Sequence, residues 1–278
     1  MANYWQMGEC CVGACKKPGQ SRMNSADAKT LRARVAWIAT SLLLCATCAA
    51  ALVCSPQFVS RATAASLGGA YYIDDAEIEK VGNCEIEHWT SFAANGDRVL
   101  VSNPACVADL GRPVELGVTV LRTKSAGDWD TTVAATAKTV FKETGGHGWG
   151  YGLSGALTYD TTTNLVNGVI INVPVSYDFS KALRVNFNVG WQYDPSQGQN
   201  FLTGGAGFAW QFKQPFSLLG EVFAIVGPEQ SNPRMQLGLR YNPAKSVDLD
   251  LIYGRNITGE RSNWITIGLN FRTDQTHD

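Results

Sequence analysis

The stretch Ala182–Tyr193 reads ALRVNFNVGWQY and changes character at every step. Its odd-numbered positions are apolar or aromatic, and its even-numbered positions are small or polar. A period of two predicts a β-strand whose two faces meet different surroundings. The apolar face is bulky throughout and ends in Trp191 and Tyr193. This pattern is typical of a strand between lipid and a polar lumen, although a half-buried strand of a soluble exported β-protein alternates too.

The same alternation recurs from Cys84 to Arg272. In 246–255, for example, Asp248 and Asp250 alternate with apolar residues, whereas the faces are mixed in 84–109 and 128–142. An even number of about twelve strands (alternative ten) predicts an all-β fold, a transmembrane antiparallel β-barrel. We expect strands at 84–93, 98–109, 113–124, 128–142, 148–159, 164–178, 181–193, 200–212, 216–226, 233–241, 246–255 and 261–272.

Aromatic residues gather near the ends of these strands, on the apolar face. Amphipathic rings settle at the depth of lipid headgroups, so this placement predicts aromatic girdles. A soluble core would instead place the rings near strand centres. The aromatic residues concerned are Trp149, Tyr177, Trp191, Tyr193, Trp210, Phe212, Tyr241, Tyr253 and Phe271.

Composition narrows the class of protein further. Only 17% of the residues are charged and the net charge is −1, which gives no electrostatic basis for binding nucleic acid. The chain contains 28 glycines, as suits a β-protein with many tight turns. A mean hydropathy of −0.08 argues against a multi-span helical membrane protein, whereas barrel strands escape such averages because half of their residues are polar.

Residues 1–64 have the plan of an N-terminal extension and a secretory signal peptide. Arg32 and Arg34 precede an apolar run at 35–53, and Ala62–Ala64 has the A-x-A form of a cleavage site. The basic region is long, so translation starting at Met23 is one reading. A single transmembrane anchor is the alternative, because the apolar run is nearly long enough to span a bilayer.

The cysteines are divided between this segment and the remainder. Six of the eight lie before residue 65, which leaves Cys84 and Cys106. These two flank a predicted hairpin turn at 94–97, since Asn-Gly is a strong two-residue turn signal. Counting outward from the turn places them nearly opposite each other, and an exported protein meets an oxidising compartment. We therefore expect a Cys84–Cys106 disulfide, with two unpaired cysteines as the alternative.

Residues 69–83, GAYYIDDAEIEKVGN, are acidic and lack alternation. We expect 65–83 to be a periplasmic linker at the barrel mouth. The predicted connections on both sides of the barrel are short, which favours a plain, open barrel. The chain thus divides into 1–64, the linker 65–83, the outer-membrane barrel 84–272 and a polar tail 273–278.

Four C-terminal segments, Tyr241–Pro243, Val247–Arg255, Asn256–Glu260 and Asn263–Leu269, are similar to part of a known family. They resemble transporter-like outer-membrane β-barrels of the phenol-degradation-pathway type. The resemblance covers the last third of the chain best. It implies a bacterial outer-membrane protein through which small, often aromatic or apolar, molecules pass. The implied partners are outer-membrane lipids, the barrel-insertion machinery and small-molecule solutes, and no oligomeric state is indicated.

No motif for catalysis or for a metal or cofactor emerges. The three histidines, His88, His147 and His277, have no partners at ligand spacing. His88 lies near Ser91, which raises the alternative of a lipid-modifying barrel enzyme, but no motif surrounds them and a solvated strand histidine is the simpler reading.

Polar residues that alternate with the apolar face are the candidate lining of the lumen. Both charge signs occur, and Arg240 and Asp248 straddle a turn symmetrically, so we expect them to face each other. These charges either neutralise one another and hold the barrel, as in a structural or adhesin-like barrel with a closed lumen, or form a constriction that filters solutes. The candidates are Glu115, Lys138, Arg184, Asn186, Asn188, Gln192, Glu221, Arg234, Arg240, Asp248 and Asp250.

Overall fold

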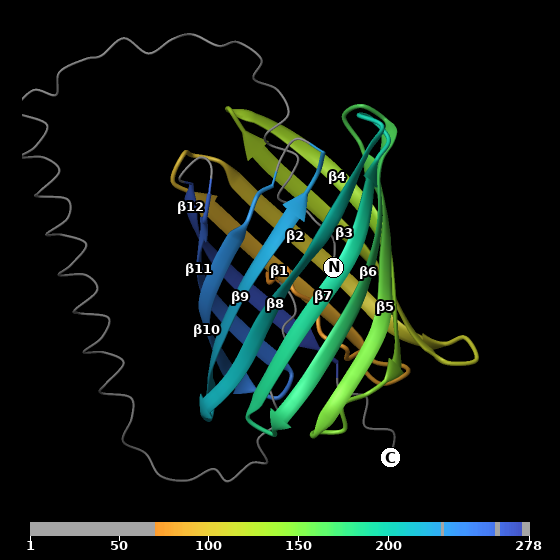
Figure 1. Ribbon diagram of the computed structural model, residues 1–278, viewed down its shortest axis with the longest axis vertical. Coiled ribbons are helices and arrows are strands. Elements are labelled where there is room, and N and C mark those ends of the chain that lie inside the picture. The colour runs from red at the N-terminus through yellow and green to blue at the C-terminus, as the bar shows by residue number, and fades with distance from the viewer. Residues whose placement is uncertain (1–69, 229–230, 259–261, 274–278) are drawn as a thin grey trace, which may run out of the picture. The chain divides into compact units, whose positions relative to one another are not determined.

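The computed structural model describes residues 70–228, 231–258 and 262–273. Within them, twelve antiparallel strands form a closed barrel in sequence order, which confirms the predicted fold class and strand number (Figure 1). The signal peptide, the start at Met23 and the tail beyond Thr273 lie outside the described residues. The strands are β1 Cys84–Ala93, β2 Arg98–Asp109, β3 Pro113–Ser125, β4 Asp128–Lys142, β5 Gly148–Asp160, β6 Leu165–Ser180, β7 Leu183–Asp194, β8 Gln199–Lys213, β9 Phe216–Val226, β10 Arg234–Ala244, β11 Val247–Asn256 and β12 Asn263–Arg272.

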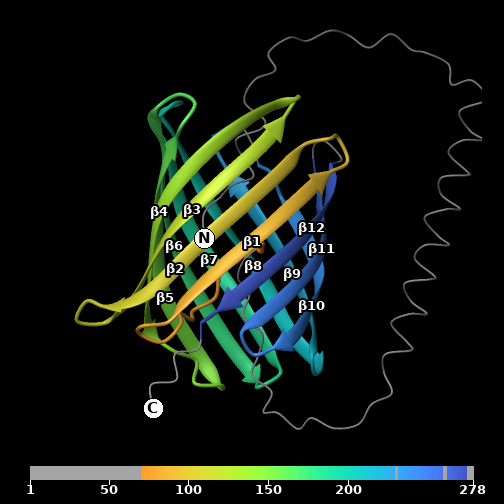
Figure 2. The ribbon, with the colours of Figure 1, turned by 180° about the vertical axis from the view of Figure 1, so that it is seen from behind.

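The first and last strands close the ring. β1 pairs with β12 from Glu85 opposite Arg272 to Ala93 opposite Trp264, so the barrel has no free sheet edge (Figure 2). β1 begins and β12 ends on the same side, which we call the terminal end of the barrel. Among the described residues, we find no helix with the length and apolar character needed to cross a bilayer.

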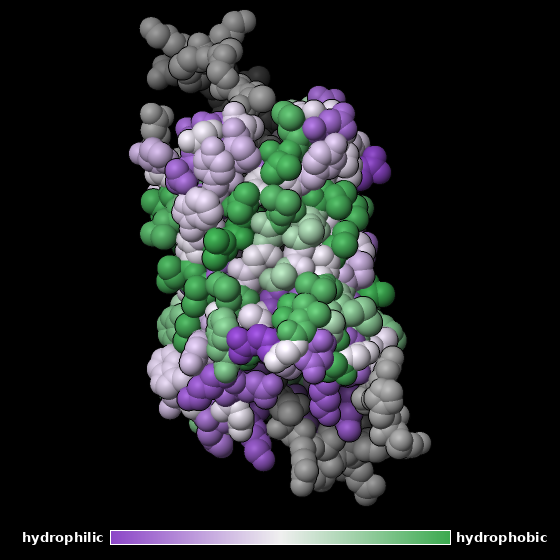
Figure 3. All heavy atoms as spheres, turned by 90° about the vertical axis from the view of Figure 1, so that its right-hand side faces the viewer, coloured by the Kyte–Doolittle hydropathy of each residue, from purple (hydrophilic) through white to green (hydrophobic). Residues whose placement is uncertain are grey.

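The two faces of the strands separate as the alternation predicts. In β7, Arg184 and Asn186 are buried inside, while Phe187 and Val189 expose 43% and 64% of their surface to the outside. The same division in the other strands places apolar side chains around the middle of the barrel and polar ones toward its ends (Figure 3). Such a belt matches the hydrocarbon layer of a membrane.

A charge placed on this belt is expected to be costly. Leu251, in the middle of β11, exposes 58% of its surface outward. Replacing it with Arg should lower the free energy of unfolding by about 2–4 kcal/mol. Leu110, in the turn after β2, is 65% exposed at the rim, and Leu110→Arg should cost only ~0–1 kcal/mol. Urea unfolding in lipid vesicles measures both values, and equal costs would argue against a membrane belt.

Aromatic rings cluster on the outer face near both ends of the barrel. At the terminal end, the Trp149 ring lies 4.7 Å from that of Tyr177, and the Phe216 ring lies 5.1 Å from that of Tyr241. Near the opposite end, the Trp191 ring stacks at 6.2 Å against the ring of a neighbouring tyrosine. These positions are those of interfacial girdles.

The weak alternation in 84–109 and 128–142 has a structural cause. On β1 to β4, several inward positions are apolar, so parts of both faces of these strands are hydrophobic. The inward side chains include Trp89, Val101 and Leu121, which are 6%, 1% and 1% exposed. The lumen therefore combines an apolar patch with a polar wall.

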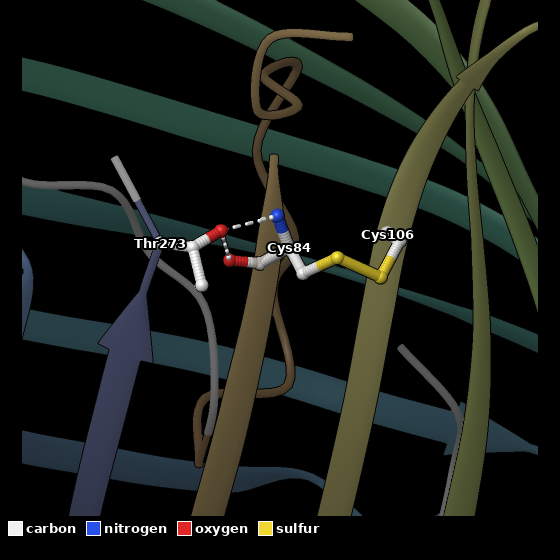
Figure 4. The surroundings of a disulfide bond; sticks show 3 residues. All are labelled: Cys84, Cys106 and Thr273. Atoms are coloured by element: carbon white, nitrogen blue, oxygen red, sulfur yellow. Dashed lines mark hydrogen bonds between the residues drawn. A yellow bond between two sulfur atoms is a disulfide. The ribbon is translucent and has the colours of Figure 1, made fainter. Parts of the chain in front are cut away.

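A disulfide joins β1 to β2 at the terminal end. The Sγ atoms of Cys84 and Cys106, which face each other in the strand register, lie 2.05 Å apart (Figure 4). Thr273, just after β12, forms hydrogen bonds with Cys84 and so connects the disulfide to the last strand. Its main-chain N–H donates to the Cys84 carbonyl oxygen at 2.8 Å, and its Oγ1 accepts from the Cys84 N–H at 2.8 Å.

Removing this disulfide should destabilise the barrel. The two cysteines are 22 residues apart, and a link of that span restricts the unfolded chain. The Cys84→Ser/Cys106→Ser variant should lose about 2–4 kcal/mol of unfolding free energy. Urea unfolding with and without reductant measures this, and alkylation of the unreduced protein should label neither residue. Equal unfolding midpoints for reduced and oxidised protein would contradict the prediction.

Candidate functional site

The interior of the barrel is the candidate site, and the candidate lining residues all lie there. Each alternates with an outward apolar neighbour and none is more than 9% exposed. They come from the inner faces of six strands rather than from one cluster. The buried residues are Glu115, Lys138, Arg184, Asn186, Asn188, Gln192, Glu221, Arg234, Arg240, Asp248 and Asp250.

Residues 70–79, which we call the inner segment, occupy this interior (orange in Figures 1 and 2). The structure therefore places this part of the predicted linker 65–83 inside the barrel rather than at its mouth. Ile73 and Ala76 are both 0% exposed. The segment forms neither helix nor strand. Its position depends on contacts with residues 63 to 166 positions away in the sequence, which a local pattern cannot indicate.

Buried ion pairs hold the acidic side chains of the inner segment. Lys138 Nζ on β4 lies 2.8 Å from a carboxylate oxygen of Asp74 and 3.4 Å from one of Asp75. Arg184 on β7 contacts Glu77, lies 3.8 Å from Asp75, and is itself fixed by Asp178 at 2.6 Å. Burial alone would raise the pKa of Asp74, but the adjacent Lys138 ammonium holds that pKa below its ordinary value.

Wall side chains also satisfy the main chain of the inner segment. The Glu221 carboxylate on β9 accepts from the N–H groups of Tyr72 and Ile73, at 2.9 and 2.8 Å. In the amide orientation that satisfies both of its ends, Asn188 accepts from the Asp74 N–H at 3.0 Å and donates to the Asp74 carbonyl at 2.8 Å. Unpaired main-chain groups would be costly in this buried position, so these wall residues replace a strand partner.

Two further wall residues continue this pattern at either end of the segment. Ser176 Oγ on β6 accepts from the Ala76 N–H at 2.8 Å. Gln236 Nε2 on β10 donates to the Ala70 carbonyl at 3.4 Å and to Glu221 at 2.6 Å. The main-chain contacts therefore follow the segment from Ala70 to Ala76.

The apolar side chains of the inner segment fit places left open by the wall. The Tyr72 ring stacks on Phe223 at 4.3 Å. A Cβ added to Gly238 would come within 2.2 Å of the Tyr71 hydroxyl, so only glycine admits this ring against β10. Shape and charge thus favour the same placement of the segment.

A second charged group lies at the terminal end. Arg240 Nε donates to Asp250 at 2.7 Å, and Arg240 Nη1 lies 3.5 Å from Asp248. The prediction that Arg240 faces Asp248 is wrong in register, because an irregularity between Tyr241 and Ala244 shifts the β10–β11 pairing and sets Arg240 opposite Asp250. Arg272 on β12 contacts Asp248 in addition.

The sequence interpretation missed several inward polar residues where the faces are mixed. Glu87 accepts from Asn103 Nδ2 at 2.9 Å, and Asn103 Oδ1 accepts from Thr119 at 2.7 Å, which makes a polar row across β1, β2 and β3. Alternation of Glu85 and Glu87 with Ile86 was the available signal. Asp178, the partner of Arg184, likewise alternates with apolar residues on β6 and faces inward.

The histidine–serine pair considered above does not form a site. His88 is exposed on the outer face, whereas Ser91 points inward and shares a 2.6 Å hydrogen bond with Thr266. Within the part of the chain that the structure describes, no His, Cys, Asp and Glu side chains are grouped so as to hold a metal ion. The interior offers charged and amide groups that can bind a polar solute.

A family model matches most of this chain. Residues 56–273 match the profile of a family described as uncharacterised conserved protein UCP029691. The chain belongs to this family. The matched region contains the inner segment and all twelve strands. A comparison with curated protein sequences gave no significant match.

Solved structures share the barrel fold. The KdgM porin, solved in complex with disordered oligogalacturonate, has a TM-score of 0.53 at 12% identity, over 67% of this chain and 98% of its own. The NanC porin has a TM-score of 0.54 at 9% identity, over the same shares of both chains. The chain therefore has the fold of a porin-type outer-membrane barrel. The phenol-degradation type stays an expectation.

Proposed function

We propose that this chain is a bacterial outer-membrane channel for the passive passage of small molecules, closed in the present state by the inner segment. One observation carries the proposal: the lumen holds a polypeptide segment together with its side chains, against a largely polar wall. An extended chain is roughly 5 Å by 10 Å in cross-section. Departure of the segment would leave a passage of about that size.

A structural barrel with a permanently closed lumen is the second candidate. The ion pairs of Lys138 and Arg184 support it, because they join the inner segment to two separate strands of the wall, β4 and β7. The two candidates differ in one property. In a channel the segment leaves and current flows, whereas in a structural barrel it stays.

Conductance separates the two candidates. We define the release variant as Asp74→Asn/Asp75→Asn/Glu77→Gln, which removes the three carboxylates that contact Lys138 and Arg184 and leaves the wall unchanged. We expect wild-type protein in planar bilayers to be mostly silent and the release variant to give single-channel steps, because the segment loses its ion pairs with Lys138 and Arg184 and Lys138 is left without Asp74 and Asp75.

The control is Glu143→Gln, an exposed residue in the loop after β4. It should behave as wild type. Heat-dependent gel mobility reports whether each variant is a folded barrel. A folded release variant with no more current than the control would favour the structural barrel.

A further inference from the structure

The wall of the lumen recognises the inner segment largely through its main chain. Glu221 accepts hydrogen bonds from two consecutive N–H groups. Asn188 accepts from the N–H and donates to the carbonyl oxygen of one residue. Ser176 accepts from one further N–H group, and Gln236 donates to one further carbonyl oxygen. These groups are present in every polypeptide, whatever its side chains. The same wall residues can therefore receive another peptide chain.

Side-chain contacts restrict which peptides fit. Lys138 and Arg184 lie where the segment carries carboxylates at two consecutive positions and a third two residues later. Phe223 adds a flat apolar surface that stacks on a ring preceding these carboxylates. Four residues that hydrogen-bond to the main chain and two cations within one passage define a ligand with an amide backbone and acidic side chains.

We propose that the lumen is a binding site for acidic oligopeptides, and that the inner segment occupies it as an internal ligand. This inference rests on the proposed function, of which it names the solute class. A peptide arriving from outside the chain competes with the inner segment for Glu221, Asn188, Lys138 and Arg184. The segment thereby keeps the passage closed until a peptide of matching chemistry displaces it.

A synthetic peptide with the sequence of residues 70–79 tests the proposal on the full-length release variant. The peptide should reduce the single-channel current in proportion to its concentration. The same peptide methylated on the main-chain nitrogens of Tyr72 and Ile73 cannot donate to Glu221. Its half-blocking concentration should rise at least about tenfold, since hydrogen bonds to a charged acceptor are lost.

A wall variant provides the complementary measurement. Asn188→Ala in the release background removes the paired contact with one residue of the peptide, and should also weaken the block about tenfold. Glu143→Gln in the same background should leave the block unchanged. If the triple substitution does not fold, Asp75→Asn alone serves as the background, because it loses contacts to both Lys138 and Arg184.

Binding of the fluorescently labelled peptide to detergent-folded protein, followed by anisotropy, keeps this test separate from the proposed function. Binding without current would support the peptide site and overturn the channel. Current without binding or block would overturn the peptide site and leave the channel intact. Equal block by the methylated peptide, or by a non-peptide tetracarboxylate at the same concentration, would also overturn it, because charge alone would then suffice.

Discussion

Replacing Lys138 with Met should raise the open probability of the barrel by about a hundredfold or more. Lys138 is 7% exposed, and its ammonium group faces the carboxylates of Asp74 and Asp75, each 2% exposed. Removing one partner of a buried ion pair leaves the other charge uncompensated and costs roughly 3–5 kcal/mol. Release of the inner segment restores water to both carboxylates, so the open state escapes most of this cost. Single-channel recording measures the ratio of open to closed time.

Lys142→Met is the matched control for this substitution. Lys142 ends the same strand but is exposed at the terminal end of the barrel, so its removal should leave the gating unchanged. Both variants must show the heat-dependent mobility of a folded barrel. A folded Lys138→Met protein that opens no more often than Lys142→Met would mean that these ion pairs do not hold the segment in place.

The strands and the candidate lining could be predicted because membrane and lumen impose opposite demands on neighbouring residues. Asn186 and Asn188 lie between Val185, Phe187 and Val189, and this contrast alone indicates which side faces inward. The rule fails where the lumen itself is apolar. Trp89 faces inward while its neighbour His88 faces outward, the reverse of what hydrophobicity indicates.

The contents of the lumen could not be predicted from such a pattern. The inner segment has no periodicity, and its main-chain partner Glu221 lies 148 and 149 residues further along the chain. One signal was available in charge. Lys138 and Arg184 are inward cations separated by several strands, and the nearest unassigned run of carboxylates is at 74–79. Whether those charges meet depends on a fold-back that sequence spacing does not encode.

Arg240 should be among the residues on which barrel stability depends most. It is 1% exposed, donates to Asp250 at 2.7 and 2.8 Å, and lies 3.5 Å from Asp248. Asp248 keeps Arg272 as a second partner, whereas Arg240 is the one cation paired with Asp250 among the residues that the structure describes. Arg240→Met should therefore lower the free energy of unfolding by about 3–5 kcal/mol, measured by urea unfolding in lipid vesicles.

Replacing Asp250, whose carboxylate is left unpaired, together with Arg240 should recover much of the lost unfolding free energy. In Arg240→Met/Asp250→Leu, two apolar side chains of similar volume replace the pair, and such replacements of buried ion pairs are often neutral or stabilising. We expect Asp250→Leu alone to be costly for the same reason as Arg240→Met, because it removes the nearer of the two carboxylates that pair with Arg240. The sum of the two single costs should then exceed the cost of the double variant by at least about 3 kcal/mol, because the double variant escapes the cost of one uncompensated buried charge. Additive costs would show that Arg240 and Asp250 act independently, and that the charges at this end of the barrel do not hold β10 to β11.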